Sequence, residues 1–275
     1  MPELPEVETY ARWLRGAYGT PGLIGRQVRR VRVRWPAAVA TPDATLFAQR
    51  LRGRTVQAVA RRGKYLLWHL ENRETVLIHL RMSGRLRWAD APPNEAARHL
   101  RLALELDDGR WLLYEDPRKF GRWWLTARPT TVLGHLGPEP WEISPDAFAA
   151  RLRARRARIK PLLLNQRFLA GVGNIYADEA LHRAGIHPAR AAHTLTSTEA
   201  ARLLYALQEV LREAILAQGT RFDAAYPWGT YQQYLRVYSR EGQVCYTCGA
   251  RIRRLRLAGR SAHYCPQCQP RVSNA

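Results

Sequence analysis

The sequence predicts an α+β protein: an N-terminal β-sandwich with one helix at its start, then a helical domain and a cysteine-rich hairpin. Three observations predict this fold class. Apolar residues alternate with polar residues between about positions 26 and 126, but recur at helical spacing between about 146 and 217. Four cysteines then occur as two close pairs near the end of the chain. A length of 275 residues is sufficient for one large or two modest domains.

The N-terminal half is expected to contain one helix and otherwise strands. A helix is predicted from Pro5 to about Gly16, where apolar residues at helical spacing follow a start rich in Pro and Glu. Leucine occupies every second position from 100 to 106, and "DDG" at 107–109 leads into "RWLLYE", which predicts a β-hairpin. The Pro- and Gly-rich segment 134–145 is the predicted linker, so this domain is expected over 1–133.

The C-terminal half has the periodicity of helices. They are expected at about 146–157, 159–168, 174–184 and 197–217. The segment "YLRVYSREGQVC" at 234–245 and the cysteine segment are expected to form short strands. This divides the rest of the chain into a helical domain over 146–238 and a C-terminal cysteine-rich domain over 239–270.

The charge of the chain points to a polyanionic partner. Lys and Arg together number 44 against 23 acidic residues, a formal net charge of +21. An excess of this size usually has a polyanionic counterpart. A membrane surface is the rival partner, but the sequence has no membrane-length apolar stretch, no signal peptide and no basic amphipathic end. We therefore expect an intracellular protein that binds nucleic acid, in a reducing compartment where its cysteines are not disulfides.

The cysteines have the spacing of a metal site. Cys245 and Cys248 form one CxxC pair, and Cys265 and Cys268 form a second one, with sixteen residues between the two pairs. Two such pairs supply the four thiolates of a closed tetrahedral zinc site, which is structural rather than catalytic. The alternative is four unrelated core cysteines or a redox pair. Zinc here would stiffen the intervening basic hairpin, which has five arginines within 251–260.

A glycine-rich turn in the helical half is a candidate phosphate site. "NQRFLAGVGNIYADEAL" at 165–181 ends one helix at "AGVG" and starts the next at Asn174, whose side chain lies beside free backbone N–H groups. An ordinary helix hairpin with glycine caps is the alternative. The basic run "RLRARRARIK" at 151–160 favours the phosphate interpretation.

Taken together, these motifs resemble the formamidopyrimidine-DNA glycosylase family of bacterial repair enzymes. The resemblance covers nearly the whole chain. Besides the cysteine pairs it rests on "PELPEVET" at 2–9, "RGKYLL" at 62–67, "HLRMSG" at 79–84, "DPRKFG" at 116–121, "LGPEP" at 136–140, "AGVGNIYADEAL" at 170–181 and "AGIHP" at 184–188. It implies a helix–two-turn–helix domain after the sandwich, one structural zinc, and a cytoplasmic, nucleoid-associated monomer that acts on double-stranded DNA containing a damaged base.

The resemblance also explains the acidic start of the chain. It implies that Pro2, exposed once Met1 is removed, is the nucleophile that forms a Schiff base with the damaged deoxyribose. An α-amino group titrates about 2.5 units below a lysine, so at pH 7 roughly a tenth of such amines are uncharged. Glu3 would protonate the sugar ring oxygen and Glu6 would support it. Without the resemblance, both glutamates would be read as favouring a helix N-terminus electrostatically.

The remaining roles implied by the resemblance are spread along the chain. Lys64 matches the lysine of β-elimination, and Arg260 the arginine of δ-elimination and phosphate binding. His79, His99, Arg155 and Asn174 match contacts to the DNA backbone. Met82, Arg118 and Phe120 match the trio that fills the gap left by the extruded nucleotide. For Met82 and Phe120, a place in the core is the alternative.

Some positions depart from the family pattern. The segment at 221–233 is shorter than the family's loop over the extruded base, so the resemblance does not fix the lesion preference. Ser239 and Asn165 also differ, at positions without a proposed chemical role. Leu4, where a glycine would suggest the endonuclease VIII type, favours oxidised purines over oxidised pyrimidines. A non-catalytic zinc-finger protein that binds damaged DNA is the alternative from another class.

Overall fold

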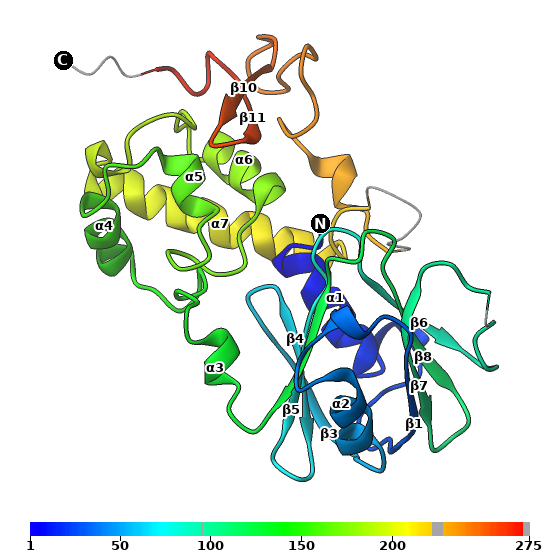
Figure 1. The fold of residues 1–275 in the computed structure, drawn as a ribbon. Coiled ribbons are helices and arrows are strands. Elements are labelled where there is room, and N and C mark those ends of the chain that lie inside the picture. Colours follow the sequence, from blue (N-terminus) through cyan, green and yellow to red (C-terminus); the bar gives the residue numbers. More distant parts are fainter. Residues whose placement is uncertain (95, 222–227, 272–275) are drawn as a thin grey trace. The chain divides into compact units, whose positions relative to one another are not determined.

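The computed structural model describes residues 1–94, 96–221 and 228–271, which form two compact units (Figure 1). The first comprises Met1–Gly134 and the second residues 135–221 and 228–271. The combination of β-sheets, helices and a terminal hairpin confirms the α+β fold class. Within the described parts of the chain, no helix combines the length and apolar character needed to cross a lipid bilayer. The domain boundaries expected from the sequence stay a prediction.

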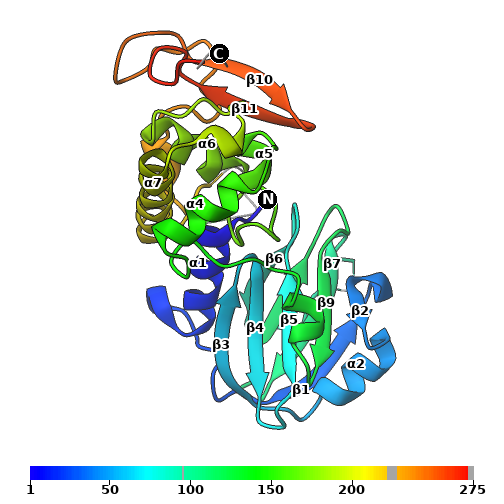
Figure 2. The same cartoon turned by 90° about the vertical axis from the view of Figure 1, so that its left-hand side faces the viewer.

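The first unit is a sandwich of two sheets. One sheet has the strand order β1-β7-β8-β6, and the other β2-β9-β5-β4-β3. Figure 2 looks onto the second sheet, in which only the β2–β9 pairing is parallel. The strands are β1 (Val28–Val33), β2 (Val39–Thr41), β3 (Val56–Arg62), β4 (Tyr65–Leu70), β5 (Thr75–His79), β6 (Arg85–Ala89), β7 (Leu100–Leu106), β8 (Trp111–Glu115) and β9 (Arg122–Thr126). The expected hairpin around 107–109 is thus confirmed as β7 and β8.

Large aromatic side chains fill the space between the two sheets. Tyr114 of β8 packs on Trp123 of β9 with ring centroids 5.3 Å apart, and Trp123 packs on Trp68 of β4 at 5.2 Å. All three side chains are buried. Since β8 and β9 belong to different sheets, this cluster joins the two layers. Aromatic rings bury a large apolar area each and so stabilise such a core strongly.

Helix α1 (Leu4–Leu14) confirms the predicted N-terminal helix, but a second helix was not predicted. α2 (Ala44–Leu51) begins where the Asp43 side chain accepts hydrogen bonds from the backbone N–H groups of Thr45 and Leu46. Phe47 and Leu51, one turn apart, bury its apolar face. The expectation of a single helix in this half was therefore wrong, because eight residues with two buried positions give a weak periodic signal. A short helix, α3 (Thr130–Leu133), ends the unit.

The described part of the second unit contains four α-helices and a two-stranded hairpin, besides the short 3-10 helices Ala192–Thr194 and Tyr231–Tyr234. The α-helices and the strands are α4 (Pro145–Arg153), α5 (Ile159–Leu163), α6 (Asn174–Arg183), α7 (Ser197–Leu216), β10 (Arg253–Leu257) and β11 (Arg260–Tyr264). Both α4 and α6 pack against α7 (Figure 1). α5 ends at Leu163, not at 168, because the Asn165 side chain accepts the backbone N–H of Arg167 and forms a turn instead.

The strands expected over 234–245 are absent from the described residues there. The backbone N–H groups of this segment bind a side chain instead of a neighbouring strand. The Glu179 carboxylate accepts hydrogen bonds from the N–H groups of Arg236, Val237 and Tyr238 at 2.8 to 3.0 Å. Burial raises the pKa of Glu179, although these three hydrogen bonds oppose the rise. The segment is thus fixed to α6 by one buried carboxylate, and no strand partner is needed.

Candidate functional site

Glu3 and Glu6 fix the backbone at the start of α1. The Glu6 carboxylate accepts the backbone N–H of Glu3 through Oε2 at 2.8 Å. Both side chains are buried, with Glu3 only 2% exposed and Pro2 partly exposed beside it. Glu6 therefore orients the residue that follows Pro2, and the two glutamates form the reciprocal capping box of a helix start.

Lys64 lies in a tight turn between β3 and β4. Arg62 pairs with Tyr65 across the two strands, so Gly63 and Lys64 form a two-residue loop. Gly63 has a φ of 56°, which the first position of such a loop requires and which glycine adopts without strain. Lys64 is only 5% exposed. The sequence thus places a buried amine at the end of the five-stranded sheet.

Helix α1 runs along β3 and brings its first residues to the same end as Lys64. Glu8 forms an ion pair with Arg61 at 3.1 Å, near the turn. Arg15, at the other end of the helix, donates to the backbone oxygen of Val59 at 3.0 Å, further from the turn. The earlier residue of α1 thus contacts the later residue of β3, which means that the helix and the strand run in opposite directions. The start of α1 and the Lys64 turn therefore lie at one end of the sandwich.

His79 ends β5 next to this turn. It pairs with Tyr65 across β4, and its ring packs edge-on against the Tyr65 ring with centroids 4.7 Å apart. Its Nδ1 accepts the backbone N–H of Arg81 at 3.0 Å, so the neutral imidazole carries its proton on Nε2. Burial raises the pKa of Tyr65, while the charge of Arg81 lowers it in part.

One buried carboxylate organises the two loops that carry Met82, Arg118 and Phe120. Asp116, 1% exposed, accepts the backbone N–H groups of Gly121 at 2.8 Å and Arg118 at 3.2 Å. It also accepts the hydroxyls of Ser83 and Tyr114. Burial, and then the Asp116 charge, raises the pKa of Tyr114. Asp116 therefore joins the turn after β5 to the loop after β8.

The tips of these loops are open to solvent. Phe120 is half exposed and Arg118 lies over its ring, with the guanidinium carbon 5.0 Å from the centroid. Met82 is partly buried, so neither Met82 nor Phe120 is a core residue. His99 is exposed, and its backbone oxygen accepts the N–H of Asp116 at 2.9 Å. Every candidate residue of the first unit thus lies at one end of the sandwich.

The glycine-rich turn of the second unit is shaped by one glutamine. Gln166 donates to the backbone oxygens of Leu164 at 3.0 Å and Val172 at 2.9 Å, and it accepts the N–H of Gly171 at 2.9 Å. Asn174 is the first residue of α6, and its buried Oδ1 has no hydrogen-bond partner within the described chain. The turn therefore presents an amide side chain at the N-terminus of a ten-residue helix.

The arginine hairpin is fixed to α6 by a buried charged group. The Oδ2 atom of Asp178 accepts the backbone N–H of His263 at 2.9 Å and lies 3.2 Å from Nδ1 of the His263 ring. The Oδ1 atom of Asp178 lies 2.6 Å from the Lys160 ammonium. Lys160 also donates to the backbone oxygen of Ser261. Arg260 follows a two-residue turn, Ala258 and Gly259, in which both φ angles are positive. Arg260 is therefore exposed at the tip of a hairpin whose second strand is bound to Lys160 of α5 and Asp178 of α6.

The four cysteines converge as the sequence predicts. Their ligand atoms all lie within 4.8 Å of one another, and Cys248 Sγ lies 3.3 Å from Cys265 Sγ and 3.5 Å from Cys268 Sγ. Tetrahedral Zn–S bonds of about 2.3 Å require sulfurs about 3.8 Å apart, so the residues fit zinc. Burial raises the pKa of Cys245, but hydrogen bonds from the Thr247 and Cys248 backbone and from His182 outweigh it and leave a pKa of about 5. That thiol is therefore a ready metal ligand.

Of the other predicted positions, Arg155 is exposed in the loop before α5. The short segment at 221–233 lies partly outside the described residues, since 222–227 are not described. Sequence reasoning missed the residues that position the site: Asp116, Gln166, Asp178 and Glu179. All four stand inside quoted stretches, Asp116 in "DPRKFG" and the other three in 165–181, and that was the only local signal.

Three family models match successive parts of the chain. Residues 1–123 match the profile of the formamidopyrimidine-DNA glycosylase N-terminal domain, 136–224 that of the H2TH domain of the same enzyme, and 242–271 a zinc finger found in FPG and IleRS. The last match, together with the four clustered cysteines, assigns one zinc ion to this site.

Individual relatives agree with these profiles. The chain is 46% identical over 280 residues to a formamidopyrimidine-DNA glycosylase from Herpetosiphon aurantiacus, which covers 98% of the chain and 100% of the relative. It is 44% identical over 281 residues to that of Pelotomaculum thermopropionicum, at 98% and 99% coverage. The crystal structure of Lactococcus lactis Fpg with DNA containing an abasic site has a TM-score of 0.89 at 36% identity, covering 98% of this chain and 100% of that one.

Proposed function

The chain belongs to the formamidopyrimidine-DNA glycosylase family, and from this we propose that it removes oxidised purines, 8-oxoguanine and formamidopyrimidines, from double-stranded DNA. It is a base-excision repair glycosylase that also cleaves abasic sites as a lyase. Complexes of the Lactococcus lactis relative contain DNA with an abasic site or with Fapy-dG, which supports this substrate class. We further propose that it acts as a monomer in the cytoplasm, on nucleoid DNA.

The observation that carries the proposal is the buried pair of carboxylates directly behind Pro2. In the proposed reaction the Pro2 nitrogen forms a bond to the sugar C1′ and the base leaves. Glu3 donates a proton to the ring oxygen as the ring opens, and Glu6 holds the Glu3 backbone in place. Lys64 then transfers the proton of β-elimination, and Arg260 assists δ-elimination at the phosphate.

The remaining candidate residues are proposed to bind and deform the duplex. His79, His99, Arg155 and Asn174 contact backbone phosphates, and Met82, Arg118 and Phe120 fill the gap left by the extruded nucleotide. The half exposure of Phe120 and the Arg118 guanidinium over its ring support this role, because an apolar wedge must be accessible to enter a base stack. The domain boundaries 1–133, 146–238 and 239–270 are part of the same proposal.

Borohydride trapping on abasic DNA tests the nucleophile. The wild-type protein should become covalently linked to DNA, and the linked peptide should begin at Pro2. Pro2→Gly should lose most of the linked product, whereas Lys64→Ala should still form it. A linked peptide that contains Lys64, or undiminished linkage in Pro2→Gly, would show that another amine attacks. No linkage in the wild type would favour the non-catalytic zinc-finger protein.

The role of Glu3 is tested with a duplex containing 8-oxoguanine. Glu3→Gln should lower excision by at least about 10²-fold, the usual contribution of a general acid. Glu6→Gln is the matched control, because it also replaces a buried carboxylate of α1 but retains the proposed acid. Equal losses in the two variants would contradict the assignment of the proton to Glu3. Preferential excision of an oxidised pyrimidine would support the endonuclease VIII type, which the matched profiles do not favour.

A further inference from the structure

The second unit contains a basic pocket that has no part in the proposed chemistry. Its volume is about 340 Å³. It lies at the loop before α5 and the loop after α6, and its lining residues are Arg156, Arg158, His187, Ala189, Arg190, Ala191 and Arg271. Arg190 is bound through two nitrogens to Glu199. Arg156, Arg158 and Arg271 have no acidic partner among the residues the structure describes, and no lining residue is acidic.

One lining residue offers a buried hydrogen-bond donor with no acceptor. His187 is 3% exposed, and its Nδ1 accepts the backbone N–H of Ala189 at 3.2 Å. The neutral ring must therefore carry its proton on Nε2. Burial, and then the charge of Arg271, lowers the pKa of His187, which keeps the ring neutral near pH 7. In the described chain Nε2 is buried and has no hydrogen-bond partner.

A buried donor without an acceptor is costly, so its presence beside three unneutralised guanidinium groups calls for a ligand. The ligand must be an anion, because every polar side chain that lines the pocket donates and none offers a free acceptor. Guanidinium groups match the tetrahedral oxygens of phosphate through paired N–H donors, and the imidazole N–H supplies one more. We propose that this pocket binds a phosphate group, either from a DNA backbone beyond the contacts assigned above or as a free phosphate ion.

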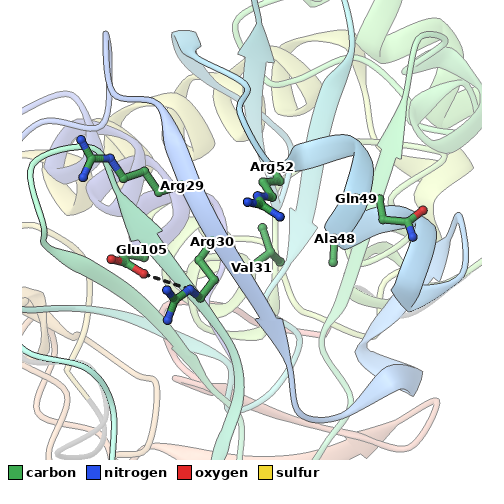
Figure 3. A pocket seen from close by; sticks show the side chains of 7 residues that line it. All are labelled: Arg29, Arg30, Val31, Ala48, Gln49, Arg52 and Glu105. Atoms are coloured by element: carbon green, nitrogen blue, oxygen red, sulfur yellow. Dashed lines mark ion pairs between the residues drawn. The ribbon is translucent and has the colours of Figure 1, made fainter.

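A pocket in the first unit provides an internal contrast (Figure 3). It is larger, about 590 Å³, and lies between β1 and α2, with Arg29, Arg30 and Arg52 among its lining residues. However, Glu105 also lines it and pairs with Arg30 at 3.3 Å, and the Arg29 side chain points away from Arg52. No buried donor without a partner lines it. A phosphate in this pocket would be repelled by the Glu105 carboxylate, and the arginines do not converge on one point, so the pocket is not a phosphate site.

The test compares the full-length wild type with Arg156→Gln/Arg158→Gln and with the control Arg29→Gln/Arg52→Gln, which removes the same charge from the other pocket. Inorganic phosphate is titrated at constant ionic strength while the imidazole N–H signals are followed by NMR. The signal of His187 is identified by its loss in His187→Gln. We expect it to shift to saturation in the wild type and control, and to require at least about tenfold more phosphate in Arg156→Gln/Arg158→Gln.

Binding of a lesion-free duplex at several salt concentrations separates the two sources. If DNA supplies the phosphate, Arg156→Gln/Arg158→Gln should reduce the slope of log K against log [salt] by about 1.8, twice the value for one contact, and the control should not. If free phosphate is the ligand, the NMR shift remains and the slopes agree. A His187 signal that does not move in about 50 mM phosphate, or moves equally in all three proteins, overturns the proposal. These readouts do not depend on catalysis, so they stand whether or not Pro2 is the nucleophile.

Discussion

Replacing Asp116 with alanine should disorder the loop that carries Arg118 and Phe120. The carboxylate accepts four hydrogen bonds, two of them from donors that are themselves buried: the N–H of Gly121 and the hydroxyl of Tyr114. The other two donors, on Arg118 and Ser83, lie in more exposed residues and can turn to water. Asp116→Ala therefore leaves two buried donors unpaired and two that solvent satisfies.

The expected magnitude follows from this division. Each buried donor left without a partner costs about 1–3 kcal/mol, so Asp116→Ala should lower the free energy of unfolding by about 2–6 kcal/mol. That is a large share of the 5–15 kcal/mol available to a typical domain. Urea denaturation followed by tryptophan fluorescence measures this loss, because the tryptophans of the first unit include buried Trp68 and Trp123. Affinity for a lesion-containing duplex should fall in parallel.

Two further variants make the reasoning refutable. Asp116→Asn can keep its oxygen towards Gly121 and Tyr114, so its loss should be clearly smaller than that of the alanine variant. Asp90→Ala removes an exposed aspartate of the same unit and should change stability by less than about 0.5 kcal/mol. A loss below about 1 kcal/mol for Asp116→Ala would show that Asp116 is not the common acceptor of this loop.

Three other outcomes are expected. Gly121→Ala should destabilise the first unit strongly, since its Cβ would lie 1.6 Å from the Tyr114 hydroxyl; thermal denaturation should show partial recovery when Tyr114→Phe is added. Burial raises the pKa of Glu199, but the hydrogen bond from Arg190 and its charge lower it by more, so the pKa in the folded protein is below the ordinary value. This pair therefore stabilises the folded protein above the pKa of the unfolded chain, about 4.3, and the stabilisation is lost as the pH falls through the pKa of the folded state. Urea midpoints should thus fall between about pH 5 and 3, and less so in Glu199→Gln. Removing zinc with a chelator should unfold the C-terminal cysteine-rich domain (239–270) and weaken DNA binding. Because this domain contains no tryptophan, the tryptophan fluorescence of the protein should stay constant. A change in fluorescence on zinc removal would contradict a finger that unfolds independently of the other domains.

The sequence by itself determined the features whose signal is local. Two CxxC pairs at fixed spacing predicted the metal site, and the structure brings all four sulfurs within 4.8 Å. Period-two leucines and "DDG" predicted the hairpin of β7 and β8, and helical spacing after Pro5 predicted α1. In each case neighbouring residues in the chain are neighbours in space, so the pattern carries the information.

Only the tertiary structure decided which polar groups hold the site together. Asp116 accepts from Ser83, 33 residues away, and Glu179 binds the backbone of 236–238, which removed the strands expected there. His187 likewise looks like part of an ordinary loop until burial leaves its Nε2 without an acceptor beside three arginines. A buried polar group must find its partner wherever the fold brings one, and that partner leaves no periodic trace in the sequence.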